Sequence, residues 1–134
     1  MSIVHHDLCF GCGVTNLFGL QMELDPVADG VSGRFFVKQD HQGSTGAAHS
    51  GVVAAALDEA MALAVHAEGI AARPRQLAVR LEAAAPVGAF VRVEARIDRR
   101  ADEKLEASAT ATADDGAEVG SATATFTPAD LASV

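Results

Sequence analysis

One long apolar segment, residues 50–68, constrains the fold of this 134-residue chain more than any other feature. Its residues are mostly Ala, Val, Leu and Met, so a helix formed by them is apolar nearly all round and has to be buried on most of its sides. His49 or Ser50 stands where such a helix would begin, and Gly69 follows where helices commonly end. We therefore predict a central helix over residues 50–68.

Six shorter segments have the composition of β-strands. They are residues 20–24, 31–37, 76–84, 89–99, 104–113 and 118–127. Apolar and polar residues alternate in the fourth and fifth of these, which predicts one dry and one wet face for each strand. The connections are short and rich in turn-forming residues, namely 25–26 with 29–30, 86–88, 101–103 and 114–116. Short connections favour antiparallel neighbours, so we predict an α+β fold in which an antiparallel sheet surrounds one helix.

The charge and the N-terminus narrow the class of protein. A formal net charge of −8 with only 10 Lys and Arg residues argues against a nucleic-acid partner, because phosphate binding requires clustered cations. The first residues lack the basic start and apolar run of a secretory signal, and Asp58 with Glu59 interrupts the apolar segment, which argues against a membrane span. We expect a single domain over residues 1–134, located in the cytoplasm.

Both cysteines of the chain, Cys9 and Cys12, lie in one short glycine-containing turn with His5 and His6 just upstream. The spacing could serve zinc, but a strong zinc signature has a second ligand pair at a defined distance, and none follows in the sequence. The strand and helix context of a thioredoxin-like redox pair is also missing. We therefore expect a tight, partly buried turn and neither a metal nor a cofactor, with stoichiometric metal in purified protein as the sign of the zinc alternative.

The run from residue 46 to residue 61 resembles the signature of hotdog-fold thioesterases of the phenylacetic-acid-pathway (PaaI-like) type. In that family a His-Gly-Gly turn enters the central helix, and an acidic residue follows nine positions after the histidine; here Asp58 follows His49 at that spacing. Residues 9–20, 86–88 and 121–126 resemble further parts of the family. The resemblance implies the hotdog fold, hydrolysis of acyl-CoA or other acyl thioesters, and a homodimer or homotetramer. Ser50 departs from the family pattern, which has glycine there.

The chemistry of thioester hydrolysis suits these residues. The reaction needs a group that attacks or activates water, and donors that stabilise the oxyanion. The backbone N–H groups of Ser50 and Gly51 at the start of the helix are free of helical partners and lie at the positive end of its dipole. Asp58 lies in an apolar helix, where desolvation raises a carboxyl pKa, so we expect it to act as nucleophile or general base. We expect His49 to support the turn rather than to transfer a proton.

Other residues have weaker assignments. The resemblance implies a water-positioning role for Gln76, because the family often has a serine or threonine at that place. Gln42 and Gly43 precede the turn and are expected at the mouth of the substrate pocket; the family often has a polar residue at position 43. Two arginines, Arg73 and Arg75, could form a basic patch for coenzyme A. Glu59 is expected to be solvated or paired at a subunit interface, near the substrate.

Helix geometry adds a condition to the hydrolase hypothesis. His49 and Asp58 are separated by about 13 Å along a helix and by about half a turn around it, so they cannot contact the same carbonyl carbon. We therefore predict a homodimer with shared active sites. Three alternatives stay open: a non-catalytic acyl-CoA-binding hotdog domain, a hotdog hydratase, and a purely structural Asp58. The last would need a buried partner such as an arginine.

Overall fold

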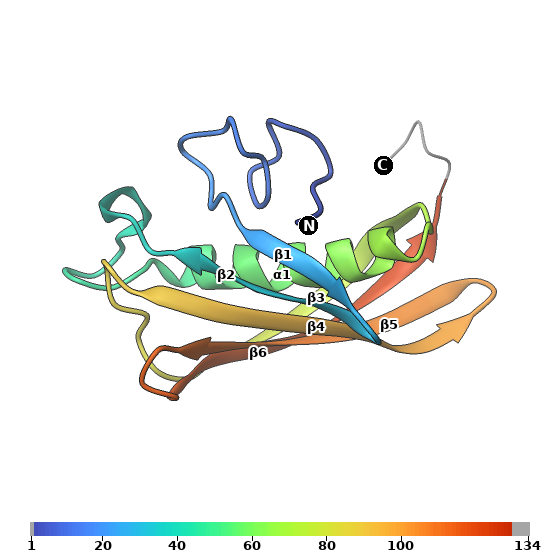
Figure 1. The fold of residues 1–134 in the computed structure, drawn as a ribbon. Helices are drawn as coiled ribbons and strands as arrows, with labels where there is room; N and C mark the ends of the chain where they lie inside the picture. The colour runs from blue at the N-terminus through green and yellow to red at the C-terminus, as the bar shows by residue number, and fades with distance from the viewer. Residues whose placement is uncertain (1, 130–134) are drawn as a thin grey trace.

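The protein, described by a computed structural model over residues 2–129, consists of one long helix packed on a six-stranded antiparallel sheet (Figure 1). Its elements are β1 (Glu23–Val27), β2 (Gly30–Phe36), the short 3-10 helix η1 (Gln39–His41), α1 (Ser50–Ala67), β3 (Ala72–Leu81), β4 (Phe90–Ala101), β5 (Lys104–Ala113) and β6 (Glu118–Pro128). The strand order is β1-β2-β4-β5-β6-β3. The predicted α+β arrangement is confirmed, and the predicted bounds of α1 and β5 agree with the structure to within one residue.

The first hairpin differs from its prediction in one detail. Asp25 and Pro26, expected in a turn, lie within β1 and pair with Ser32 and Val31 of β2. Proline is tolerated there because β1 is an edge strand, where a missing N–H leaves no gap in a ladder. The turn of the hairpin is made only by residues 28–29.

The segment after α1 also differs from its prediction. β3 begins at Ala72 rather than at residue 76, and it pairs with β6, not with the next strand in the chain. The connection that follows β3 is therefore a crossover from the sheet edge to β4 and not a hairpin turn. Its backbone is tied to the loop before α1, because Ala48 N–H donates to Ala85 O at 2.8 Å and Val87 N–H donates to Gly46 O at 3.0 Å. The crossover thus fixes the loop that leads into the helix.

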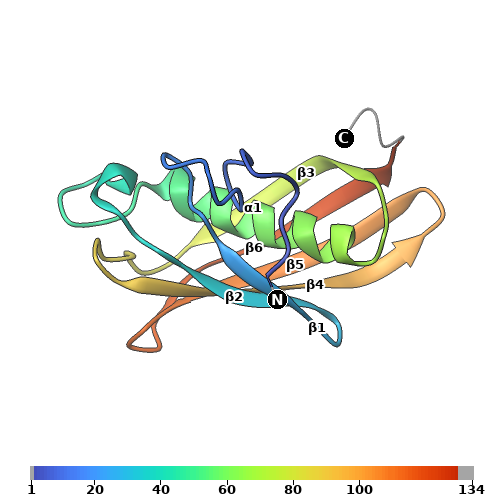
Figure 2. The same ribbon diagram turned by 45° about the horizontal axis from the view of Figure 1, so that its top comes forward.

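The helix is covered on two sides, as its composition requires. One side packs on the sheet, whose strands β4 and β5 alternate buried and exposed residues as predicted. The N-terminal segment, residues 2–22, lies across the opposite side of α1 (Figures 1 and 2). Leu57, Met61 and Leu63 are fully buried as a result. By length and composition α1 could also cross a membrane, but half of it is buried inside the protein and it carries Asp58 and Glu59.

Candidate active site

The turn that leads into α1 leaves one backbone N–H without a hydrogen-bond partner among the described residues. His49 is the N-cap residue, and its Nδ1 accepts the Gly51 N–H at 2.8 Å. The His49 carbonyl accepts the N–H groups of Val52 and Val53. Among the hydrogen bonds within residues 2–129, none uses the Ser50 N–H. Of the two amides predicted as oxyanion donors, only that of Ser50 is therefore available, because the histidine itself caps the other.

The loop before the turn holds His49 in place. The His49 N–H donates to His41 O at 2.7 Å. Gly43 passes so close to the turn that a Cβ on it would lie 2.7 Å from the Cα of His49, so any other residue at this position would require the turn to shift. The Gln42 side chain accepts the Gly46 N–H at 2.5 Å, so it supports the loop. Gln42 and Gly43 thus help to shape the turn, and their predicted contact with substrate stays a prediction.

An open groove of about 620 Å³ runs past the turn. It is lined by residues 43–44, 47–50 and 53 on one side and by residues 81–85 and 119 on the other. Sequence reasoning missed the second group, because the crossover after β3 carries no chemical motif and reaches the turn only through the fold. His49 and Ser50 thus both line a groove that is open to an extended ligand.

Asp58 lies on α1, half-buried, and does not line this groove. Burial, assisted by the neighbouring Glu59 charge and partly opposed by the charge of His5, raises the pKa of the Asp58 carboxyl, as expected. Its carboxylate makes no hydrogen bond or ion pair with any residue of the described part of the chain. Since Asp58 is about 13 Å along the helix from His49, one chain does not bring the two together.

The remaining predicted residues lie on β3. Gln76 is exposed, faces Thr125 across the strand pair, and lines a separate hollow with residues 98, 106 and 123. Gln76 therefore does not line the groove beside the turn, and its water-positioning role stays a prediction. Arg73 and Arg75 are exposed on the same strand, and Arg75 Nε donates to the Thr127 hydroxyl at 3.0 Å.

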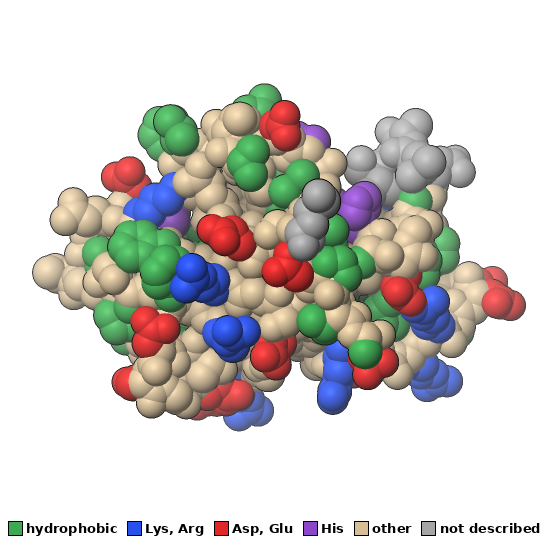
Figure 3. All heavy atoms as spheres, viewed as in Figure 1, with side chains coloured by type: hydrophobic (Ala, Val, Ile, Leu, Met, Phe, Trp, Pro, Cys, Tyr) green, Lys and Arg blue, Asp and Glu red, His purple; other side chains and the backbone are tan. Residues whose placement is uncertain are grey.

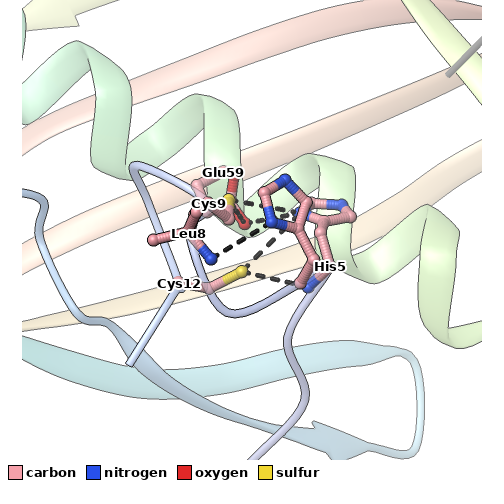
Figure 4. A network of polar contacts seen from close by, with 6 residues as sticks. His5, Leu8, Cys9, Cys12 and Glu59 are labelled. Atoms are coloured by element: carbon pink, nitrogen blue, oxygen red, sulfur yellow. Dashed lines mark hydrogen bonds and ion pairs between the residues drawn. The ribbon is translucent and has the colours of Figure 1, made fainter. Parts of the chain in front are cut away.

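Glu59 differs from its prediction. Its side chain is only 12% exposed and forms an ion pair with His5 of the N-terminal segment at 2.8 Å (Figure 4). This hydrogen-bonded contact raises the pKa of His5 to about 9, and burial raises the pKa of the nearby Cys12 thiol. The tight, partly buried cysteine turn is confirmed, with Cys12 buried and Cys9 partly buried. The fold brings Glu59 to this turn from fifty residues away, which no local pattern indicates.

His41 is a buried histidine that supports the loop of the groove. It is 3% exposed, and its Nδ1 accepts the Lys38 N–H at 3.1 Å. The neutral ring therefore carries its proton on Nε2, which donates to Gly19 O at 3.2 Å. Burial lowers the pKa of His41, and the charge of Lys38 lowers it further. The hydrogen bond to Gly19 O and the charge of Asp40 raise this pKa but do not outweigh burial. His41 is thus held neutral in the folded protein.

We expect the free energy of unfolding to fall as the pH is lowered through 6.5, the ordinary pKa of histidine, because the unfolded chain then binds a proton that folded His41 resists. This contribution is at most about 1.4 kcal/mol per pH unit and stops below the folded pKa. His41→Asn removes the titrating group and should reduce the slope. Urea unfolding of both proteins between neutral and mildly acidic pH measures this, and equal slopes would contradict the assignment.

Comparisons with known proteins agree with this architecture. The family model described as the thioesterase superfamily matches residues 45–120, more than half of the chain. A hypothetical thioesterase from Streptococcus pneumoniae TIGR4, solved with coenzyme A, superimposes with a TM-score of 0.76 at 19% identity, covering 81% of this chain and 85% of that one. The smu.793 protein of Streptococcus mutans UA159, bound to acetyl-CoA, has a TM-score of 0.75 at 19% identity, covering 81% and 88%.

The PaaI protein of the E. coli phenylacetic acid degradation operon has a TM-score of 0.75 at 14% identity, covering 81% of this chain and 83% of that one. None of the curated proteins compared by sequence matches the chain. At these identities the solved structures establish the fold. The predicted hotdog fold and the resemblance to PaaI-like thioesterases are thereby confirmed.

Proposed function

We propose that this chain, which belongs to the thioesterase superfamily, hydrolyses acyl-CoA thioesters. The substrate class is supported by two solved relatives of the same fold, one containing coenzyme A and one acetyl-CoA. An acyl-CoA ester combines an extended acyl chain with a long pantetheine arm. The open groove beside the helix entrance is accessible to a ligand of that shape.

The observation that carries the proposal is that the half-buried Asp58 carboxylate has no bonding partner among the described residues. A half-buried carboxylate costs free energy unless it is paired, and a structural role would provide that pair. Within residues 2–129 the Asp58 carboxylate has neither a hydrogen bond nor an ion pair. A half-buried carboxylate with a raised pKa and no hydrogen-bond partner among the described residues is well suited to accept a proton from water or to attack a carbonyl. We assign it that role.

The second component is the Ser50 N–H. It has no hydrogen-bond partner within residues 2–129, lies at the positive end of the α1 dipole and belongs to a residue that lines the groove. In the proposed reaction, Asp58 activates a water molecule or attacks the thioester carbonyl carbon directly. The carbonyl oxygen becomes an oxyanion that accepts a hydrogen bond from the Ser50 N–H, and collapse of the tetrahedral intermediate releases the thiolate of coenzyme A. When water attacks, the acyl group leaves directly as the free acid; when Asp58 attacks, the acyl group forms a mixed anhydride with Asp58, and water then hydrolyses it to the free acid and the Asp58 carboxylate. The His49 side chain keeps the turn in position through its bond to Gly51.

The two components have to come from different chains, so we propose a homodimer, whether alone or within a tetramer. If a two-fold axis crosses α1 near Ala54, midway between Ser50 and Asp58, the two helices run antiparallel and each carboxylate lies beside the other chain's entrance turn. Ala54 is small and half-buried, which permits close approach. The free edge strand β3 also exposes Leu77 by 42% and Leu81 by 50%, an apolar strip suited to a subunit contact.

A panel of acyl-CoA esters of different chain lengths, incubated with the native protein while free thiol is measured, tests the proposal. We expect enzyme-dependent thiol release from at least one ester. Saturable acyl-CoA binding without thiol release would overturn it in favour of the acyl-CoA-binding alternative. The matching acyl-pantetheine esters lack the phosphorylated nucleotide, and a higher KM for them would indicate that cations such as Arg73 and Arg75 contact it.

A further inference from the structure

Four side chains of the types that bind zinc converge where the N-terminal segment crosses α1. They are His5, Cys9, Cys12 and Glu59, here called the Cys–His–Glu cluster (Figure 4). One ligand atom from each lies within 4.8 Å of all the others. We propose that the Cys–His–Glu cluster binds one Zn²⁺ ion, which fastens the N-terminal segment onto α1 beside Asp58.

Three of the six distances between ligand atoms of the cluster match a zinc tetrahedron. With Zn–S bonds of about 2.3 Å and Zn–N or Zn–O bonds of about 2.0 Å, tetrahedral ligands place sulfur about 3.5 Å from nitrogen or oxygen. In the structure both Cys9 Sγ and Cys12 Sγ lie 3.7 Å from His5 Nδ1, and Cys9 Sγ lies 3.5 Å from Glu59 Oε2. These three edges therefore need almost no movement to accept the ion.

One edge is shorter than the tetrahedron requires. His5 Nδ1 and Glu59 Oε2 are 2.8 Å apart, whereas a shared zinc ion places nitrogen and oxygen about 3.3 Å apart. The short distance is that of a hydrogen bond, in which a proton occupies the space between the two atoms. Zinc binding displaces such protons from its ligands, so the required opening of about half an ångström accompanies the exchange.

Glycines in the cysteine turn allow the N-terminal segment to fold tightly and to lie close to α1. A Cβ at Gly11 would lie 2.4 Å from Glu59 Cγ, so glycine allows the turn to approach α1 there. A Cβ at Gly13 would lie 2.4 Å from the Asp7 carbonyl oxygen, so glycine allows the turn itself to close. The Gly13 N–H donates to Cys9 O at 2.8 Å, which closes the turn. The His5 N–H donates to Cys12 Sγ at 3.2 Å, an interaction that stabilises a metal-bound thiolate.

The ligand set indicates zinc and a structural role. Thiolates and imidazole favour zinc over magnesium or calcium, and four protein ligands leave no open position for substrate. The N-terminal segment also needs support, since it is formed of turns and irregular backbone and exposes Leu8, Phe10, Val14, Leu17 and Phe18. Figure 3 shows several exposed hydrophobic side chains at the top of the molecule, on the side where Figure 1 places this segment. A metal that binds only the folded arrangement adds its binding free energy to the stability of this segment.

Metal binding can be measured independently of any activity. Protein freed of metal by a chelator and kept reduced is titrated with Co²⁺. We expect saturation at one equivalent, with thiolate-to-cobalt charge-transfer bands and intense tetrahedral d–d bands. Added Zn²⁺ should displace the Co²⁺ and raise the Tm. Absence of these bands, or a Cys9–Cys12 disulfide that persists under reducing conditions, would overturn the proposal.

Matched variants locate the site. His5→Asn and Glu59→Gln should abolish one-to-one cobalt binding or weaken it by tenfold or more, about the effect that even the outer partners of a metal site have. His6→Asn changes the adjacent exposed histidine, and Glu68→Gln changes an exposed acid at the end of the same helix; both should bind like the native protein. Near-native binding by His5→Asn or by Glu59→Gln would exclude the proposed ligand set.

Discussion

Asp58→Asn should lower kcat for acyl-CoA hydrolysis by about 10²- to 10⁴-fold, the range that one positioned acid or base contributes. Asparagine has nearly the size of aspartate but can neither accept a proton from water nor attack a carbonyl. The variant should still fold, because the Asp58 carboxylate forms no hydrogen bond or ion pair within residues 2–129 that the change would break. We therefore expect a Tm at or above that of the native protein, together with the loss of kcat.

The matched control is Glu68→Gln at the C-terminal end of the same helix. Glu68 pairs with Arg100 on the surface, where ion pairs contribute little to stability, and it lies outside the proposed site. Its kcat should equal that of the native protein. Steady-state kinetics and thermal unfolding of both variants are the measurements. A folded Asp58→Asn variant with kcat within about twofold of native would remove Asp58 from the mechanism.

Ser50→Pro should lower kcat by about 10²- to 10³-fold, the effect of removing one oxyanion donor. Proline deletes the backbone N–H that we assign to the oxyanion, yet it is well accepted at the first position of a helix. The preceding residue, His49, has φ −59° and ψ 141°, the extended conformation that a following proline requires. Ser50→Ala retains the N–H and should retain activity, so equal activities of the two variants would contradict the assignment.

Mixed dimers of these variants test the shared site. Refolding Asp58→Asn and Ser50→Pro chains together gives heterodimers in which one site carries both defects and the other carries neither. Random association should then restore about one quarter of native activity. If each site were formed within one chain, every site would carry one defect and mixing would restore nothing. Activity against the mixing ratio, with the mass of the species measured in parallel, decides between the two.

Local sequence patterns were sufficient to predict the helix and strands whose composition matches their burial in the fold. The bounds of α1 follow from its apolar residues and the glycine after it, and β4 and β5 follow from alternation. The proline in β1 was misassigned because its tolerance depends on the strand being at an edge, which is a property of the whole sheet. The start of β3 was missed for a similar reason: Arg73, Pro74 and Arg75 look like a loop until β6 pairs with them.

For the candidate site, spacing in the sequence identified Asp58 and the His49 turn, but not which of their atoms form hydrogen bonds. Only the folded structure shows that His49 Nδ1 accepts the Gly51 N–H, while the Ser50 N–H has no hydrogen-bond partner within residues 2–129. The groove wall at residues 81–85 arises from a crossover that sequence reasoning had interpreted as a hairpin turn.

The sequence by itself determined a buried helix with one acid in a dry setting, an antiparallel sheet, and a turn placed too far from that acid to share a substrate within one chain. These properties depend on residues near one another in the chain, where periodicity and helical rise apply directly. Only the tertiary structure decided that Glu59 meets the cysteine turn and that Gln76 lies away from the groove. Such contacts join segments tens of residues apart, and their geometry is decided by how helix, sheet and N-terminal segment pack together.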